Sequence, residues 1–381
     1  MSKTWNPLLS VPAFPPARFA TLADRLARLL GTKADVLLIQ AEAVLALEAV
    51  ALGLARPGVV ALNIVTSFYG GWFGDWLRRG DAEVRDLVAA PGQPVELAAM
   101  RAAITGMQRL DIVAFAHGEG ANGLLNPLAE IAALAQARGA LVVVDAVASI
   151  GAHHLAVDAQ GLDVTVIGPQ KGLGGPAGIS AVSISPAAWA WFGAPGGLTN
   201  SALSLLDLKR NWLERGRGAL PGMPLDIEFW ALEAALDRVD AEGLETLIAR
   251  HALAARAARA GLRALGVAPW IADDSAASTL ITAAPVPPGL DATQVLALAR
   301  RLDTGISPGG PGVENLLVRL NHTGPRAAFA PVLATVLAYG TALQSLGMEV
   351  SPGAAAEMVA AVYAGIADRA FLPHKISPNH E

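Results

Sequence analysis

Cysteine is absent from this sequence of 381 residues. Without a thiol, the chain has no disulfide bond, no thiolate metal site and no cysteine nucleophile. The adjacent pair His153 and His154 does not predict a metal site, because neighbouring strand residues face opposite ways and no further ligand follows at a suitable spacing. The sequence also lacks a Gly-x-Ser-x-Gly nucleophile elbow and a Walker phosphate loop. We therefore predict no metal and no sulfur chemistry.

Long uninterrupted apolar runs are also missing, although the mean hydropathy of +0.43 is high. The longest apolar stretches, 41–55 and 329–346, are interrupted by Glu48, Thr335 and Gly340. Neither reaches the ~20 apolar residues that a bilayer span needs, so we expect buried helices and no membrane partner. The proline-containing N-terminal segment has no extended apolar core, which predicts no signal peptide and a cytoplasmic location.

Charge of one sign is not concentrated anywhere in the chain. The formal net charge is −5, and no run of like charges exceeds a few residues. This distribution argues against nucleic acid and against an anionic membrane surface as a partner. We therefore expect the partners to be small molecules.

What the sequence does contain is a regular alternation of short apolar runs and helical segments. The pattern predicts a parallel, helix-covered α/β sheet, in which a ligand lies beyond the carboxyl ends of the strands. The segments that follow successive strands carry Glu42, Tyr69, the 117–123 loop, Asp145 and Lys171, so we expect these residues to converge. We predict that residues 67–74, SFYGGWFG, form one of these exit loops and that the next helix begins at Asp75.

A change of pattern in the last third of the chain predicts a second domain. Shorter strands and helices follow a long helical region. We predict a large α/β domain over residues 17–250 that binds coenzyme and substrate. A smaller α+β domain is predicted over residues 251–381, together with residues 1–16.

The most informative stretch of the sequence runs from residue 141 to residue 185. One apolar run ends at Asp145, and the next, 164–167, leads through Gly-Pro-Gln to Lys171. Taken singly, an acid or a lysine at such a position is more often a solvated surface residue. Together they suit pyridoxal chemistry, in which the amine forms a Schiff base with the aldehyde and the carboxylate keeps the pyridine nitrogen protonated.

The strings DAVAS and GPQKGLGGPAG, about twenty residues apart, resemble the aspartate and lysine segments of the class V aminotransferases. The resemblance implies the type I fold of enzymes that use pyridoxal 5′-phosphate, with a mostly parallel seven-stranded sheet and a smaller C-terminal α+β domain. Within the class, the pattern resembles the alanine–glyoxylate aminotransferase group and is closest to the pyridoxamine–pyruvate transaminases. The cysteine desulfurases of the same class are excluded, because they need a cysteine.

The resemblance also implies roles for the residues around the ring. Lys171 falls on the Schiff-base lysine that shuttles the proton, and Asp145 falls on the partner of the ring nitrogen. Val147 and Tyr69 would pack on the two ring faces, although an ordinary core aromatic is an equal alternative for Tyr69. Gln170 would donate a hydrogen bond to the periphery of the coenzyme.

Two further positions are implied by the same resemblance. Gly120, in the His-Gly-Glu loop, stands where the family often has a serine or threonine that donates to the ring hydroxyl, so another donor such as Asn122 is needed. Arg319, in LLVRLNHTGP, matches the arginine that binds the substrate carboxylate. The transaminases named above have a second arginine nine residues earlier, where this chain has Gly310.

The phosphate position shows the clearest departure from the class. Class V enzymes usually present Ser, Gly, Thr or His at the start of the helix after the first strand, where free N–H groups bind an anion. This chain has Glu42 there, in the string QAEAV, and a carboxylate repels a phosphate. The pyridoxamine–pyruvate transaminases also have a glutamate in this turn and use unphosphorylated pyridoxamine as a substrate.

We therefore predict an aminotransferase that moves an amino group from pyridoxamine to pyruvate, or another 2-oxo acid, giving pyridoxal and L-alanine from pyruvate. Bound pyridoxal or pyridoxamine would be a substrate. A conventional aminotransferase with pyridoxal 5′-phosphate, of the alanine–glyoxylate or serine–glyoxylate type or with pyruvate as the acceptor, is the first alternative. A catalytically decayed relative is the second. In this fold, active sites are usually shared between subunits, so we expect a homodimer or homotetramer.

Overall fold

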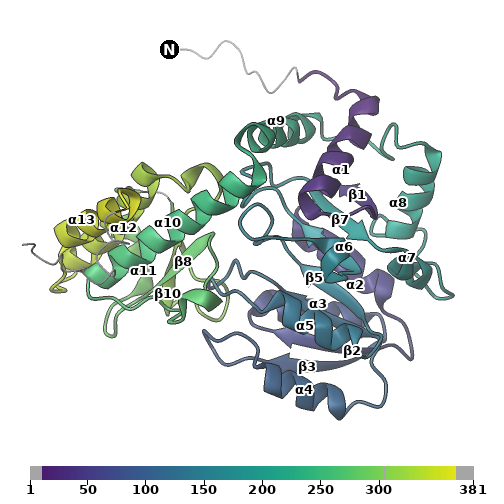
Figure 1. Ribbon diagram of the computed structural model, residues 1–381, viewed down its shortest axis with the longest axis horizontal. Helices are drawn as coiled ribbons and strands as arrows, with labels where there is room; N and C mark the ends of the chain where they lie inside the picture. The colour runs from purple at the N-terminus through teal and green to yellow at the C-terminus, as the bar shows by residue number, and fades with distance from the viewer. Residues whose placement is uncertain (1–10, 304, 366–381) are drawn as a thin grey trace, which may run out of the picture.

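A sheet of seven strands forms the centre of the larger of two bodies in the computed structural model, which describes residues 11–303 and 305–365 (Figure 1). The strand order is β1-β7-β6-β5-β4-β2-β3, and all neighbours are parallel except those of β7. The strands are β1 (Asp35–Ile39), β2 (Val60–Val65), β3 (Glu83–Val88), β4 (Ile112–Ala116), β5 (Leu141–Asp145), β6 (Val164–Ile167) and β7 (Ser180–Ile184). The predicted mostly parallel seven-stranded sheet is confirmed.

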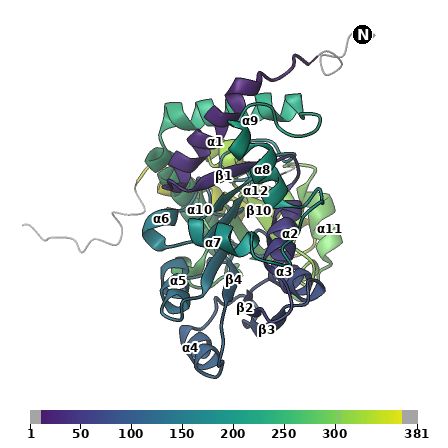
Figure 2. The same cartoon turned by 90° about the vertical axis from the view of Figure 1, so that its right-hand side faces the viewer.

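Helices cover both faces of this sheet, because its central strands are apolar on both sides. In Figure 2, α5 and α6 lie on one side of the strands and α2 and α3 lie on the other. The helices of this body are α1 (Pro16–Leu30), α2 (Ala43–Leu54), α3 (Phe68–Arg79), α4 (Leu97–Thr105), α5 (Leu128–Gln136), α6 (Val157–Gln160), α7 (Pro186–Phe192), α8 (Leu205–Asn211) and α9 (Asp226–Glu242).

A smaller body with an antiparallel sheet of order β8-β10-β9 completes the fold. The long helix α10 (Leu244–Ala264) runs from the larger body toward it (Figure 1). Its other elements are β8 (Ile281–Pro285), α11 (Ala292–Ala299), β9 (Ile306–Pro308), β10 (Leu317–Asn321), α12 (Phe329–Ser345) and α13 (Pro352–Tyr363). Each body has its own apolar core, one extending through Leu247 and the other beginning at Ala254.

Phe14 places the described start of the chain with the larger body. Its ring lies 5.1 Å from that of Phe19 and 5.6 Å from that of Phe229, within the larger core. We expected residues 1–16 to belong to the small domain, but residues 11–16 pack on the larger body. The reason is that the Phe14 ring is buried against aromatic side chains of that body. The remaining parts of that expectation, 1–10 and 366–381, lie outside the described residues.

The glycine-rich segment after β2 is helical, which corrects the expectation of a loop over 67–74. Helix α3 already begins at Phe68, and the Ser67 side chain caps it by accepting from the backbone N–H of Tyr69. A Cβ at Gly70 would lie 2.9 Å from the Ile64 carbonyl oxygen. The glycine is needed for the close approach of the helix to the strand, and not for a turn.

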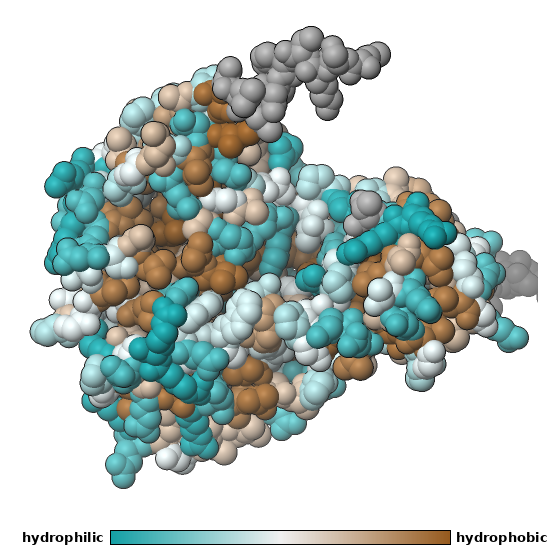
Figure 3. Space-filling model, turned by 180° about the vertical axis from the view of Figure 1, so that it is seen from behind, coloured by the Kyte–Doolittle hydropathy of each residue, from teal (hydrophilic) through white to brown (hydrophobic). Residues whose placement is uncertain are grey.

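Apolar residues are also present at the surface. A broad apolar area lies on the larger body in the view of Figure 3. Within the described ranges, none of the helices has both the length and the apolar character that a membrane crossing requires.

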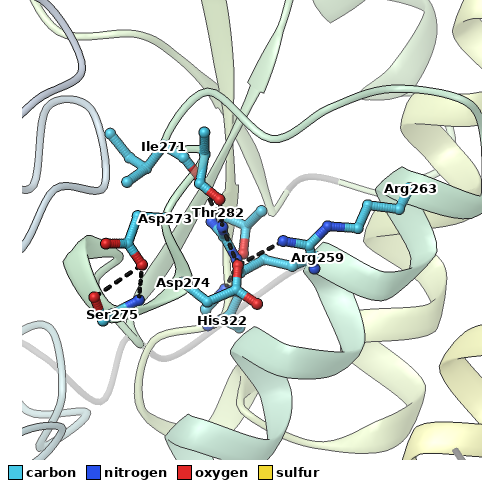
Figure 4. Close-up of polar contacts among 9 residues, drawn as sticks. Arg259, Arg263, Ile271, Asp273, Asp274, Ser275, Thr282 and His322 are labelled. Carbon is cyan, nitrogen blue, oxygen red and sulfur yellow. Dashed lines mark hydrogen bonds and ion pairs between the residues drawn. The ribbon is translucent and has the colours of Figure 1, made fainter. Parts of the chain in front are cut away.

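Three buried histidines make the fold sensitive to acid. Burial lowers the pKa of His117 and His251 to about 4 and that of His322 to about 3. Nε2 of His322 lies 2.9 Å from the Thr282 hydroxyl, and Figure 4 shows these two side chains beside α10. Because an unfolded histidine has a pKa of about 6.5, acid protonates the unfolded chain first.

We predict that the free energy of unfolding contributed by these histidines falls as the pH drops from about 6.5 toward 4. Each should contribute about 1.4 kcal/mol per pH unit. Replacing His322 with glutamine should lower the dependence of the unfolding free energy on pH by one such contribution. Other titrating groups contribute equally to the wild type and the variant, so their contributions cancel in the difference between the two slopes. Urea titrations at pH values of about 7.5, 6 and 5 would measure both slopes. Equal slopes in the wild type and His322→Gln would contradict the prediction.

Candidate active site

Loops at the carboxyl ends of the strands converge on one cavity. The cavity is lined by Glu42, Tyr69, Glu119, Gly120, Asp145, Val147 and Lys171, among others. The two other predicted residues adjoin it: Gln170 contacts Glu42, and Arg319 contacts Gly120. The structure therefore brings together all eight residues singled out from the sequence.

Asp145 is the last residue of β5 and faces the cavity. Its Oδ1 accepts a hydrogen bond from the Val147 N–H at 2.9 Å, which fixes the carboxylate. Burial raises the pKa of Asp145, while the Lys171 ammonium and the Val147 N–H act in the opposite direction. A carboxylate in this position is suited to a cationic partner inside the cavity, such as a protonated ring nitrogen.

Lys171 follows β6 and directs its amine into the same cavity. Burial lowers the pKa of this amine, and the nearby carboxylates of Asp145, Glu119 and Glu42 oppose that effect. The Nζ atom lies 6.0 Å from the centre of the Tyr69 ring. Burial thus favours the neutral, nucleophilic form of the lysine.

Gly120 gives the lysine its space. A Cβ atom at position 120 would lie 2.5 Å from Lys171 Nζ. A serine or threonine at this position would therefore have to displace the lysine amine. Asn122, the other donor considered for the ring hydroxyl, has its amide committed to the backbone, because Nδ2 donates to the Thr66 carbonyl and Oδ1 accepts from the Leu124 N–H.

Tyr69 is positioned by the close packing of α3 on β2. Gly70 and Gly74 face the sheet, and the Asn63 amide donates to the Gly70 carbonyl at 2.9 Å. A Cβ at Gly74 would lie 2.6 Å from the Asn63 amide nitrogen. The first turn of the helix therefore holds Tyr69 at the cavity, where burial is the main cause that raises its pKa.

Glu42 occupies the N-terminus of α2. Its Oε2 accepts from the Val44 N–H at 2.8 Å, and its Oε1 accepts from the Gln170 amide at 3.0 Å. Helix N-termini attract anions because their first N–H groups lack partners within the helix. Here the protein supplies that anion from its own side chain, and Gln170 is turned toward it.

Arg319 reaches the cavity from β10 in the smaller body. Its Nε donates to the Pro308 carbonyl and its Nη1 to the Gly120 carbonyl, each at 2.6 Å. A guanidinium has five N–H groups, so the fork retains donors for a carboxylate. Burial lowers the pKa of Arg319, and no carboxylate of the described residues forms an ion pair with it.

Gly310 is closed in by its neighbours. Its N–H donates to the Ala121 carbonyl at 3.0 Å, and a Cβ there would lie 2.6 Å from the Ala121 Cβ and 2.8 Å from the Phe68 ring. An arginine side chain would need the loop and the aromatic ring to move. Phe68 and Ala121 thus replace the second cation with apolar surface.

A hydrogen-bond network that was not predicted from the sequence holds the 117–123 loop. Glu119 is buried, and it accepts from the hydroxyl groups of Thr66 and Ser67 at 2.6 Å. Asn126 donates to the Thr66 hydroxyl at 2.9 Å. The position of Thr66 and Ser67 directly after β2 was the available signal, but their partner lies more than fifty residues away.

A segment of the smaller body also supports this loop. The Leu125 N–H donates to the Ala276 carbonyl, and the Ser278 N–H donates to the Gly123 carbonyl, each at 2.8 Å. Figure 4 shows how α10 holds this segment, with Arg259 and Arg263 both directed at Asp274. The cavity is therefore built from both bodies. The described part of the chain contains no group of acidic or histidine side chains arranged to hold a metal ion.

The comparisons with known proteins agree with this geometry. A family model described as aminotransferase class V matches residues 24–330, so the chain belongs to the class V aminotransferases. It is 32% identical to the pyridoxamine–pyruvate transaminase of Mesorhizobium japonicum over 92% of this chain and 89% of that one. The solved pyridoxamine–pyruvate aminotransferase from Mesorhizobium loti superposes with a TM-score of 0.87, at 31% identity and with the same coverage.

A more distant structure shares the fold. The ureidoglycine–glyoxylate aminotransferase from Bacillus subtilis has a TM-score of 0.84 at 23% identity, covering 94% of each chain. The predicted family, fold and enzyme class are thus confirmed. Class V aminotransferases use pyridoxal 5′-phosphate, so this cavity belongs to an enzyme of pyridoxal chemistry.

We predict that Thr66→Val destabilises the protein by about 1–3 kcal/mol, because it leaves a buried carboxylate and a buried amide without one partner each. Thr66→Ser, which retains the hydroxyl, should restore most of this loss. Urea unfolding of both variants beside the wild type would measure it. Equal stability of the valine variant would show that the network adds little.

Proposed function

We propose that the protein transfers an amino group from pyridoxamine to pyruvate, or to a similar 2-oxo acid, and that pyridoxamine is a substrate without a phosphate. The observation that carries this proposal is Glu42, which places its own carboxylate at the N-terminus of α2. A carboxylate and a phosphate about 4 Å apart repel each other by about 4 kcal/mol at an effective dielectric constant of 20. The free hydroxymethyl group of pyridoxamine would instead donate a hydrogen bond to Glu42.

The remaining residues have roles that follow from their surroundings. When bound, the pyridine ring supplies an electron sink for the carbon that carries the amino group. Val147 and Tyr69 hold the two faces of the ring, and Asp145 keeps the proton on its nitrogen. The Nζ atom of Lys171 moves a proton from the pyridoxamine carbon that carries the amino group to the carbon of the 2-oxo acid that receives this group. The lowered pKa of the amine favours this role.

Arg319 binds the carboxylate of the 2-oxo acid through the donors that Pro308 and Gly120 leave free. Its attachment to the Gly120 carbonyl keeps the guanidinium beside the lysine. The substrate is thereby oriented so that the bond to be broken is perpendicular to the plane of the pyridine ring. Phe68 and Ala121, which enclose Gly310, favour an acceptor with a small apolar group such as the methyl of pyruvate.

We predict that the wild type binds pyridoxal roughly 100-fold more tightly than pyridoxal 5′-phosphate and converts pyridoxamine and pyruvate to pyridoxal and L-alanine. Glu42→Gln should lower the ratio of the dissociation constants of pyridoxal 5′-phosphate and pyridoxal by at least about tenfold, because it removes the repelling charge. Absorbance titrations give the two dissociation constants, and borohydride trapping followed by mass spectrometry locates the adduct at Lys171.

Glu48→Gln, on the same helix but remote from its N-terminus, is the matched control and should retain the wild-type preference. Tight binding of the phosphorylated form by the wild type, with amino transfer to glyoxylate, would identify a conventional class V aminotransferase instead. Failure of both forms to react with Lys171 in the folded protein would identify a catalytically decayed relative.

We also propose that the active protein is a homodimer or homotetramer. A groove lined by Gln40, Leu45, Leu205, Leu220 and Pro221 opens beside the α2 end of the cavity. Leu45 is 44% exposed there, and Figure 3 shows how much apolar surface the larger body presents. A second copy covering this groove would remove that surface from water and close the cavity.

Analytical ultracentrifugation should therefore give a mass about two or four times that of one 39.1 kDa chain. The mass should persist on dilution, because an apolar interface of standard size is stable. A mass of one chain at all concentrations would contradict the proposal.

A further inference from the structure

His251 lies on α10, away from the cavity, and is fully buried. Its Nε2 is 3.0 Å from the backbone N–H of Gly324 and its Nδ1 is 2.9 Å from the Leu247 carbonyl. Because an N–H can only donate, Nε2 must be the acceptor and Nδ1 must carry the hydrogen. The imidazole is therefore neutral and in one defined tautomer.

The neighbouring residue completes the hold on Gly324. Arg250 donates from Nη1 to the Gly324 carbonyl at 2.7 Å, while its Nη2 donates to Glu242 at 3.0 Å. Both polar groups of one glycine residue are thus bound by two consecutive side chains of α10. These two hydrogen bonds, one to each polar group of Gly324, hold the turn that follows β10.

Gly324 in turn lies directly against the lysine loop. A Cβ on Gly324 would be 2.7 Å from the Gly174 Cα and 3.1 Å from the Lys171 carbonyl oxygen. Gly174 has the same restriction from the other side, since its Cβ would lie 2.7 Å from the Pro325 ring. Both glycines have positive φ angles, +53° and +62°, so the two backbones meet where no side chain fits.

Each of the two glycines lies only a few residues along the chain from Lys171 or Arg319. Gly174 follows Lys171 by three residues and donates to the Lys171 carbonyl at 3.1 Å. Gly324 follows Arg319 by five residues, just beyond the end of β10. The contact between the two glycines therefore joins the loop of the reactive amine to the strand of the guanidinium, with no room for a side chain between them.

We propose that His251 is a positioning residue that sets the separation between Lys171 and Arg319 by seating Gly324 against Gly174. It touches no substrate and acts through the backbone of the turn. Loss of its acceptor releases the Gly324 N–H, and the strand that carries Arg319 shifts relative to the lysine. This inference rests on the proposed amino transfer, because it concerns how tightly the carboxylate of the 2-oxo acid is bound.

His251→Leu removes the acceptor and keeps an apolar side chain, whereas His251→Gln retains an acceptor at the end of the side chain. We expect His251→Leu to raise the KM for pyruvate about tenfold, with a kcat within about threefold of wild type and an unchanged affinity for pyridoxal. His251→Gln should return the KM toward the wild-type value. Thermal unfolding confirms that each variant is folded at the assay temperature.

His153→Leu is the matched control, because His153 also accepts a backbone N–H, but that of Thr279, at 3.2 Å. It should lower the stability of the protein and leave the KM for pyruvate unchanged.

Hydrogen exchange gives a readout that does not depend on turnover. Peptides covering residues 171–175 and 319–325 should both exchange faster in His251→Leu, and neither should do so in His153→Leu.

Faster exchange in the 319–325 peptide alone, with an unchanged KM, would overturn the proposal and leave His251 as a structural residue. A wild type that does not transaminate pyruvate would instead contradict the proposed function. In that case the exchange of the 171–175 peptide still decides whether His251 couples the two loops.

Discussion

The structure depends on one constraint, which is that a reactive amine must be kept in a buried cavity without a salt bridge to any carboxylate of the described residues. Burial lowers the pKa of Lys171, and three carboxylates act against that effect from a distance. Each carboxylate is held by other donors: Asp145 by a backbone N–H, Glu119 by two hydroxyl groups and Glu42 by a helix N-terminus. Hydrogen bonds that fix the acids in place leave the amine free to react.

The α2 terminus shows how one physical feature can serve a different ligand. The unpaired N–H groups at a helix start favour an anion, which can be a phosphate or a carboxylate. In this chain the glutamate that precedes the helix provides the anion, and Gln170 adds a second donor. In class V enzymes this turn commonly binds the phosphate of the coenzyme. Here the Glu42 carboxylate already occupies the helix N-terminus, and this cap supports the proposal that the substrate is unphosphorylated pyridoxamine.

The smaller body contributes more than the guanidinium of Arg319. Its 276–278 segment is bonded to the loop that contains Gly120, and its turn at Gly324 lies against the lysine loop. Both contacts are between backbones, so they depend on glycine and on local hydrogen bonds rather than on the size of side chains. The cavity therefore depends on the relative placement of the two bodies. Helix α10 contacts both of these segments, through His251 at the Gly324 N–H and through Arg259 at Asp274.

Much of this could be read from the sequence, because it depends on local pattern. Apolar runs separated by helices determine a parallel sheet, and a parallel sheet brings residues after its strands, such as Asp145 and Lys171, to one edge. The sequence also located Glu42 at a helix start. It could not determine that residues 68–74 are helical, because glycines that favour a turn in isolation are needed here for contact with β2. Nor could it pair Glu119 with Thr66, or His251 with Gly324, since such partners are far apart in the chain and only packing brings them within hydrogen-bond distance.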